Sequence, residues 1–189
     1  MSGLRLHRTV ALVGLMGAGK TSVGRRLAQE LSLPFVDADS EIERAAGQSI
    51  EDIFERHGEP LFRDGERRVI ARLLDGLPHV LATGGGAFMD ANTRALLKER
   101  AITIWIKADL DILLSRVGRR NHRPLLKNGD KRAILERLMA ERHPIYAEAT
   151  FTIDSSDSPP EEMVTRVIAR LQHYLADHPE AGAATAVAP

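Results

Sequence analysis

Residues 14–21 read Gly-Leu-Met-Gly-Ala-Gly-Lys-Thr and match the pattern G-x-x-x-x-G-K-[ST]. The apolar run at 9–13 comes directly before this stretch, and apolar residues recur at helical spacing from Val23 to Leu31 after it. A strand, a glycine-rich loop and a helix in this order cradle phosphate, because successive backbone N–H groups and the helix N-terminus attract an anion. The stretch therefore predicts a site for a nucleoside triphosphate.

The loop also predicts individual contacts. Lys20 is expected to reach the β- and γ-phosphates, and the Thr21 hydroxyl is expected to bind Mg²⁺. The alternative is a glycine-rich turn that only begins a helix. Phosphate-binding loops serve hydrolases, switches and transferases, so the loop does not identify the reaction. The residues predicted to bind ATP here are Gly17, Ala18, Gly19, Lys20, Thr21 and Ser22.

The composition narrows the class of protein. The 189 residues include 26 basic and 26 acidic side chains and no cysteine. Balanced charge provides no general attraction for nucleic acid, and the lack of cysteine excludes disulfides and thiolate chemistry. The chain has neither a signal-peptide-like start nor a run near the ~18 apolar residues of a membrane span. We expect a cytoplasmic monomer that binds neither nucleic acid nor membrane.

Short apolar runs alternate with amphipathic stretches of helical length along the chain. Such alternation predicts an α/β fold with a buried parallel sheet and ligands beyond the carboxyl ends of its strands. We expect a single domain over residues 1–176 and a disordered tail over 177–189. The predicted strands are residues 9–13, 34–37, 79–83, 101–106 and 149–154, and the predicted helices are residues 21–31, 39–46, 50–57, 59–75, 92–100, 110–119, 131–147 and 160–175.

Residues 118–130 are polar, basic and flanked by glycines, which suits a mobile lid better than a packed element. We predict a lid there. Its basic residues Arg119, Arg120 and His122 receive no individual role.

Polar residues after the second and third predicted strands indicate an acceptor site. Asp37 and Asp39 are spaced so that one carboxylate could hold Mg²⁺ through water and the other a hydroxyl, although Asp39 could instead be a helix N-cap. The glycine triplet at 84–86 either leaves the backbone bare for a ligand or forms a flexible turn. Arginine suits carboxylate and phosphate binding but usually lies on a solvated face. The candidate arginines are Arg63, Arg116, Arg123 and Arg142.

Taken together, these segments resemble the shikimate kinase family. The resemblance covers roughly residues 9 to 175 in the family's order, and it is far more specific than the loop alone. It rests on residues 14–24, 37–43, 47–54, 58–66 and 82–87, on Arg-Pro-Leu-Leu at 123–126 and on Arg-His-Pro-Ile-Tyr at 142–146.

The resemblance implies a P-loop three-layer α/β/α sandwich with a five-stranded parallel sheet, like that of the nucleoside monophosphate kinases. It implies a substrate-binding region near residues 38–66 and a lid. The implied reaction transfers the ATP γ-phosphate to the 3-hydroxyl of shikimate with Mg²⁺, on the route to chorismate and the aromatic amino acids.

The resemblance also implies residue roles on the acceptor side. Arg63 and Arg142 resemble a clamp for the shikimate carboxylate, and Asp39 resembles the residue that holds the hydroxyl. The backbone wall would be Gly84, Gly85 and Gly86. Three further residues match positions that line or brace this pocket, but core packing or a salt bridge remains an equal explanation for them: Phe54, Phe62 and Glu66.

On the nucleotide side, Arg123 resembles the lid arginine that closes onto the phosphates, and Arg116 resembles an adenine-stacking arginine. Asp37 would reach Mg²⁺ through water, with Thr21 as the direct ligand. The predicted catalytic residues are then Asp39, Lys20 and Arg123.

Two alternatives remain open at this point. One is another small P-loop kinase, acting on gluconate or a nucleoside monophosphate, against which the glycine triplet and the Phe62-Arg63 pair argue. The other is a regulatory protein that binds the same ligands without turnover. Only about eight residues precede the first predicted strand, too few for a helix-turn-helix unit.

Overall fold

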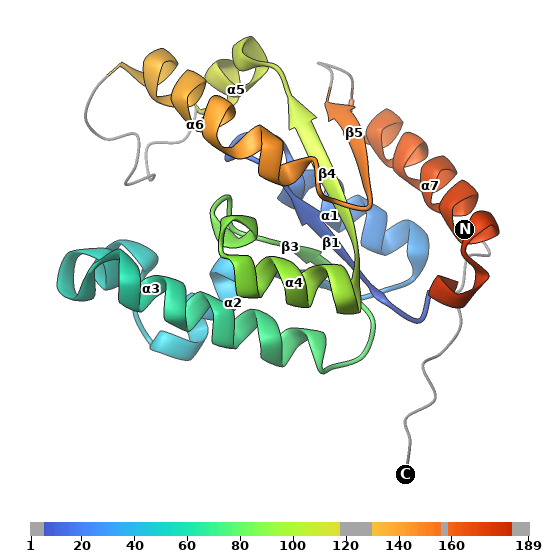
Figure 1. Ribbon diagram of the computed structural model, residues 1–189, viewed down its shortest axis with the longest axis horizontal. Coiled ribbons are helices and arrows are strands. Elements are labelled where there is room, and N and C mark those ends of the chain that lie inside the picture. The colour runs from blue at the N-terminus through green and yellow to red at the C-terminus, as the bar shows by residue number, and fades with distance from the viewer. Residues whose placement is uncertain (1–5, 118–129, 156–158, 183–189) are drawn as a thin grey trace.

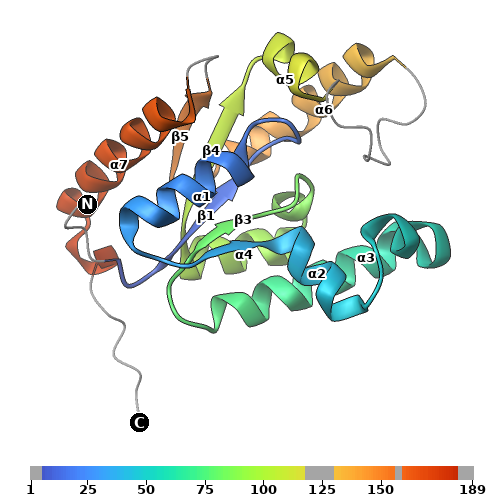
Figure 2. The same cartoon turned by 180° about the vertical axis from the view of Figure 1, so that it is seen from behind.

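The computed structural model describes residues 6–117, 130–155 and 159–182. Its centre is a five-stranded parallel sheet in the order β2-β3-β1-β4-β5 (Figure 1; Figure 2). All five residues of β1 are buried, as expected for the middle strand of a sheet covered on both faces. The strands are β1 Thr9–Val13, β2 Phe35–Asp37, β3 Val80–Ala82, β4 Ala101–Ala108 and β5 Phe151–Ser155.

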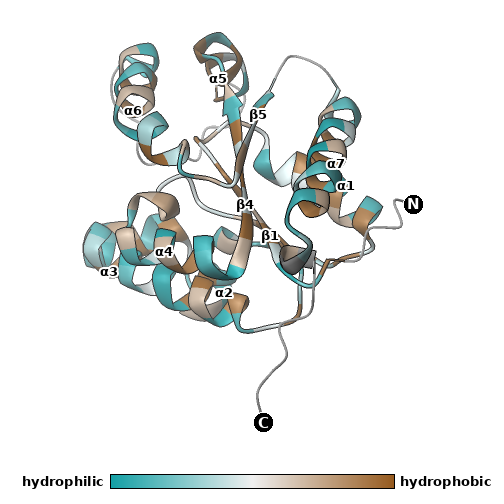
Figure 3. Cartoon of the chain, turned by 45° about the vertical axis from the view of Figure 1, so that its right-hand side comes forward, coloured by the Kyte–Doolittle hydropathy of each residue, from teal (hydrophilic) through white to brown (hydrophobic). Residues whose placement is uncertain are grey.

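Helices cover both faces of the sheet, so the predicted three-layer α/β/α sandwich is confirmed (Figure 3). The α1 helix packs beside α7 on one face, while α4 packs against β4 on the other face and also contacts α3. The helices are α1 Lys20–Leu31, α2 Ala38–Ala46, α3 Ile50–Leu74, α4 Ala91–Arg100, α5 Leu110–Val117, α6 Lys131–Tyr146 and α7 Pro160–Asp177, with the 3-10 helices η1 Ala87–Met89 and η3 Pro179–Gly182.

The predicted break between two helices near residue 58 lies inside α3. Gly58 has φ 77° and ψ 172°, which are not helical values, and the chain changes direction there. Pro60 then falls in the first turn after the break, where its missing N–H costs no helical hydrogen bond. The break separates the N-terminal turns of α3 from the segment that carries Arg63.

The α2 and α3 helices have a small core of their own beside the main one. Four buried side chains form it: Ile42, Ile53, Phe62 and Val69. The main core lies on both faces of the sheet. The acceptor-side helices are therefore held to one another by packing that is separate from the core beneath the phosphate loop.

The prediction of a disordered tail is wrong for residues 177–182. The α7 helix continues to Asp177 and is followed by η3, in which Ala181 is buried. The His178 ring stacks on Tyr174 at 4.5 Å, and the His178 N–H donates to the Tyr174 carbonyl at 2.9 Å. These contacts order the segment although its composition lacks periodicity. Residues 183–189 lie outside the described residues.

The predicted lid over 118–130 also lies outside the described residues, apart from its last position. Asp130 is the N-cap of α6, and its side chain accepts from the Arg132 N–H at 2.9 Å. The α6 helix therefore begins immediately after the segment that the sequence assigns to the lid.

Candidate active site

A cavity of about 820 Å³ lies at the carboxyl ends of β1, β2, β3 and β5. This is the edge at which parallel α/β sheets bind ligands. Arg123 lies outside the described residues. Every other predicted site residue lines the cavity: Gly17, Ala18, Gly19, Lys20, Thr21, Ser22, Asp37, Asp39, Arg63, Gly84, Gly85, Gly86, Arg116 and Arg142.

The phosphate loop turns tightly between β1 and α1. Gly14, Gly17 and Gly19 have φ values of 139°, 84° and 102°, a region that glycine adopts at little cost. The loop ends at the N-terminus of α1, where backbone N–H groups and the helix dipole favour an anion. Lys20 Nζ donates to the Gly14 carbonyl at 2.7 Å and to the Leu15 carbonyl at 3.0 Å, which holds the ammonium group against the loop.

Thr21 and Asp37 meet beside the loop. The Thr21 hydroxyl donates to Asp37 Oδ2 at 3.0 Å, and Asp37 Oδ1 accepts from the backbone N–H groups of Asp39 at 3.1 Å and Ser40 at 3.4 Å. Asp37 is therefore the N-cap of α2, and Asp39, in the first turn, is not. The alternative interpretation of Asp39 as the cap is thus excluded.

The Thr21 and Asp37 side chains suit Mg²⁺. Both provide oxygen, the atom that Mg²⁺ prefers, and a magnesium bound with a triphosphate needs only one or two protein oxygens. Within the described ranges, no group of three or more His, Asp or Glu side chains could hold a metal by itself.

On the acceptor side, Glu66 and Asp39 lie against the backbone of Gly84. A Cβ atom at Gly84 would lie 2.8 Å from Glu66 Oε1 and 2.9 Å from Asp39 Oδ1, so only glycine allows both carboxylates to approach this closely. Glu66 is 2% exposed, and Oε1 makes no hydrogen bond with any described residue. Burial raises the pKa of Glu66, the charge of Arg63 opposes that rise, and the charge of Asp39 adds to it.

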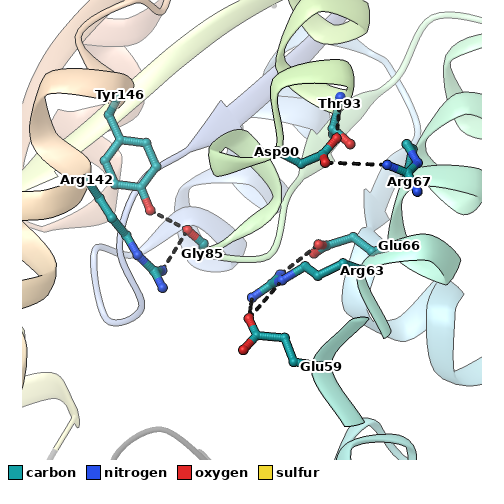
Figure 4. A network of polar contacts seen from close by, with 9 residues as sticks. All are labelled: Glu59, Arg63, Glu66, Arg67, Gly85, Asp90, Thr93, Arg142 and Tyr146. Carbon is teal, nitrogen blue, oxygen red and sulfur yellow. Dashed lines mark hydrogen bonds and ion pairs between the residues drawn. The ribbon is translucent and has the colours of Figure 1, made fainter. Parts of the chain in front are cut away.

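Arg63 is held from two sides (Figure 4). Its guanidinium donates to Glu66 Oε2 at 2.7 Å and to Glu59 Oε1 at 3.1 Å and 3.2 Å. It also lies 5.1 Å from the centre of the Phe62 ring. A Cβ atom at Gly86 would lie 2.6 Å from the carbon atom of this guanidinium, so the glycine triplet and Arg63 are in close contact. These contacts orient a cation in the cavity.

Arg142 and Tyr146 both donate to the Gly85 carbonyl oxygen, Arg142 Nη1 at 3.1 Å (Figure 4). Both side chains come from α6, one turn apart. Arg142 is partly buried and lines the cavity, whereas Tyr146 is completely buried. The wall made by the glycine triplet is therefore tied to α6.

Arg116 lies at the nucleotide end of the cavity. Its Nη1 donates to the Ala18 carbonyl at 3.2 Å and to the Ser155 hydroxyl at 3.1 Å. The first contact reaches the phosphate loop and the second reaches the end of β5. Arg116 therefore lies where a nucleotide held by the loop would extend.

Ser155 and Tyr146 belong to the hydrogen bonds of this site, although the sequence analysis gave them no role. Ser155 is the last residue of β5 and lines the cavity. Its place at the end of a strand could have indicated this role, because ligands bind at the carboxyl ends of parallel strands. Tyr146 belongs to the segment 142–146 that supports the family resemblance, but no role was predicted for it. Its spacing of four residues from Arg142 was the available signal, because residues i and i+4 share a helix face.

A nucleotide loop and an acceptor pocket that share one cavity are the two halves of a small-molecule P-loop kinase, and this protein is of that class. A model of the family described as shikimate kinase matches residues 16–172. The chain belongs to the shikimate kinase family, and it is a kinase, as the sequence predicts.

Individual relatives agree with this family. A shikimate kinase of Paramagnetospirillum magneticum is 60% identical over 90% of this chain and 88% of its own length. One of Rhodopseudomonas palustris is 57% identical over 91% of this chain and 85% of its own. A structure described as shikimate kinase from Acinetobacter baumannii in complex with shikimate is 38% identical, with a TM-score of 0.86 over 89% of this chain and 94% of that one.

Proposed function

We propose that this chain transfers the γ-phosphate of ATP to the 3-hydroxyl of shikimate, giving shikimate 3-phosphate and ADP for aromatic amino acid biosynthesis. The observation that carries the proposal is the single cavity in which the phosphate loop faces Asp39, Arg63 and Arg142. Shikimate has a carboxylate at one end and hydroxyls at the other, and this cavity offers two guanidinium groups for the carboxylate and an aspartate for a hydroxyl. The Acinetobacter baumannii relative, whose structure contains shikimate, supports the same acceptor.

Arg63 and Arg142 bind the shikimate carboxylate in this proposal. Guanidinium groups match carboxylates in shape and charge, and both arginines reach the cavity from partly buried positions. Gly84, Gly85 and Gly86 form the wall between them, since a side chain at Gly84 or Gly86 would overlap the acceptor residues.

Asp39 holds the hydroxyl that is phosphorylated. It can accept the proton as the hydroxyl oxygen forms its bond to the γ-phosphorus and the bond from that phosphorus to the β-γ bridging oxygen breaks. Asp39 projects from the first turn of α2, whose cap is provided by Asp37, so its carboxylate is not needed to begin the helix. The negative charge of Asp39 also favours a hydroxyl over a carboxylate beside it.

Lys20 and the backbone of residues 17–22 hold the triphosphate, and Arg116 lies beside the nucleotide. Arg123 is assigned to the γ-phosphate through its place in the Arg-Pro-Leu-Leu segment, outside the described residues. Thr21 and Asp37 would hold Mg²⁺, Asp37 through water. When bound, Mg²⁺ offsets the charge of the phosphate oxygens.

We expect the enzyme to act as a monomer in the cytoplasm, without nucleic acid or membrane as partner. In the described parts of the chain, no helix is long and apolar enough to span a membrane. Sedimentation analysis at micromolar concentration measures the oligomeric state directly, and a dimer mass would contradict the expectation.

The reaction is tested with purified full-length protein, Mg-ATP and one acceptor at a time. We expect ADP release coupled to shikimate consumption, with shikimate 3-phosphate identified by mass spectrometry and ³¹P NMR. Gluconate and a nucleoside monophosphate serve as alternative acceptors under the same conditions.

Two outcomes contradict the proposal. Turnover of gluconate or a nucleotide without turnover of shikimate would place the chain with other small P-loop kinases. Calorimetric binding of ATP and shikimate without any turnover would instead favour a regulatory protein.

A further inference from the structure

The Gly85 carbonyl is the one backbone group of the acceptor wall that receives two side-chain donors among the described residues. Arg142 Nη1 donates at 3.1 Å and the Tyr146 hydroxyl donates to the same oxygen (Figure 4). A carbonyl oxygen has two lone pairs, so both bonds can exist together. The duplication needs an explanation, because one donor would satisfy the oxygen.

The two donors differ in their freedom to move. Tyr146 is completely buried, with its ring 6.4 Å from that of Phe88 and 5.8 Å from that of Trp105. Burial raises the pKa of Tyr146 to about 12, so its hydroxyl keeps the proton that it donates. Arg142 is partly buried and its guanidinium lines the cavity. Only Arg142 can turn toward a ligand.

The proposed function places a carboxylate beside Arg142. The arginine binds it with both arms of its guanidinium when Nη1 turns from the Gly85 carbonyl to the carboxylate. A partly buried carbonyl left without a protein donor disfavours that change, and this opposition would weaken substrate binding. The Tyr146 hydroxyl is a second donor that stays in place, so the Gly85 carbonyl keeps a hydrogen bond when Arg142 leaves it.

We propose that Tyr146 is a positioning residue whose hydroxyl keeps the Gly85 carbonyl hydrogen-bonded while Arg142 exchanges that carbonyl for the substrate carboxylate. The inference rests on the proposed function, in which Arg142 binds the carboxylate of shikimate. Tyr146 itself does not touch the substrate. It acts through Arg142 and through the glycine wall.

Tyr146→Phe removes the hydroxyl and keeps the ring that packs on Phe88 and Trp105. The Gly85 carbonyl then depends on Arg142, so shikimate must compete with it. We expect the Kd and the KM for shikimate to rise about tenfold, the size expected when one hydrogen-bond donor is lost. We expect kcat at saturating shikimate and the KM for ATP to stay within about twofold.

A double-mutant cycle distinguishes two roles of Tyr146. One is the exchange at Arg142, and the other is direct support of the glycine triplet at 84–86. The full-length wild type, Tyr146→Phe, Arg142→Ala and the double variant are titrated with shikimate by calorimetry, and by NMR where binding is weak. Without Arg142 there is nothing to exchange, so Tyr146→Phe should change the Kd by less than about twofold in the Arg142→Ala background. That strong non-additivity is the expected result.

Two controls account for effects on folding. Tyr174→Phe alters the other tyrosine, on α7, and should leave the Kd unchanged. Leu171→Ala removes a buried side chain from the same helix, and it shows what a loss of stability alone does to shikimate binding. Urea titration of each variant gives the stabilities to be compared.

The possible failures are distinct. Equal Kd increases from Tyr146→Phe in both backgrounds would overturn the exchange role while leaving the proposed function intact, as would no increase in either. If Arg142→Ala leaves the Kd for shikimate unchanged, the carboxylate assignment of Arg142 fails, and this inference fails with it.

Discussion

Asp37 and Asp39 are two residues apart, yet their carboxylates do different work. Asp37 caps α2 and accepts from Thr21, so its carboxylate faces the helix start and the phosphate loop. Asp39 approaches Gly84 and Glu66 on the acceptor side. One turn of helix thus connects the nucleotide half of the cavity to the acceptor half.

Asp39→Asn should lower kcat by about 10²–10³ and leave the KM for ATP within a few-fold. The amide keeps the shape of the side chain but cannot take the hydroxyl proton, and the cap at Asp37 keeps α2 folded. Steady-state kinetics measure the change. Asp75→Asn, at the C-cap of α3, is the matched control. Near-normal turnover by Asp39→Asn would show that Asp39 does not take the hydroxyl proton.

The buried carboxylate of Glu66 makes folding depend on pH. Its pKa in the folded state is raised by burial above the ordinary 4.5, so the folded protein binds this proton more tightly than the unfolded chain. The free energy of unfolding should therefore fall as pH rises from about 4.5 through the folded-state pKa, and then level off. Glu66→Gln removes this pH dependence of the free energy of unfolding. We expect wild type to lose stability relative to Glu66→Gln across that window in urea titrations.

Glu161→Gln is the control for this pH dependence. Glu161 is exposed, and its hydrogen bond with Arg26 lowers the pKa of the carboxyl. Its contribution is lost only as pH falls below about 4.5, so the difference from wild type should be flat above that value. A flat difference for Glu66→Gln as well would mean that the pKa of Glu66 is not raised.

At the scale of elements, the close approach of α1 to the sheet depends on one helical glycine. A Cβ atom at Gly24 would lie 2.7 Å from Phe35 Cε2 and 3.2 Å from Leu12 Cδ1. The helix therefore sits on the strands nearer than a side chain at this position allows. That distance determines where the N-terminus of α1 meets the phosphate loop.

Gly24→Ala should lower the free energy of unfolding, because overpacking costs about 1–3 kcal/mol and exceeds the gain in helix propensity of about 0.5–1 kcal/mol. Gly65→Ala is the matched control. Gly65 also lies inside a helix, but a Cβ atom there would meet nothing within 4 Å. The control should be stabilised by about 0.5–1 kcal/mol in the same urea titration. Equal effects of the two changes would contradict the packing argument.

For the whole molecule, the two halves of the cavity share the main core, to which α2 and α3 contribute Ala38, Ile70 and Leu74, but the acceptor half also has a smaller core of its own. The phosphate loop and α1 rest on the main core, while α2 and α3 are held together by Ile42, Ile53, Phe62 and Val69. The α6 helix contacts the acceptor wall through Arg142 and Tyr146. Ligands should therefore stabilise the fold through distinct sets of residues.

Mg-ATP or shikimate at 100 times its Kd should each raise the free energy of unfolding by about 2.7 kcal/mol. Lys20→Ala should lose most of the ATP increment and keep that of shikimate, whereas Arg63→Ala should do the reverse. Denaturant titrations with each ligand measure both increments. Loss of the ATP increment in Arg63→Ala would contradict the division of the cavity into two halves.

Local patterns along the chain were enough to predict the helices, the strands and the residue types of the site. The pattern at 14–21 predicts a strand, a loop and a helix in that order. The alternation of apolar runs with amphipathic helices predicts a parallel sheet. Both patterns involve residues that are close together in the chain, so they can be recognised without the structure. Most described helix and strand limits fell within two residues of the predicted ones. The tail at 177–182 was the exception, since its order comes from Tyr174 and Ala181 contacts rather than from its own composition.

Which groups of the site meet depends on how distant segments of the chain pack together. Gly85 and Tyr146 are 61 residues apart along the chain, and Ala18 and Arg116 are 98 residues apart. Helical or strand periodicity cannot predict contacts over such separations. The structure also settled which aspartate caps α2 and showed that Glu66 is a buried partner of Arg63. Hydrogen bonds and burial of this kind depend on how distant segments pack around the sheet, and that packing is a property of the whole fold.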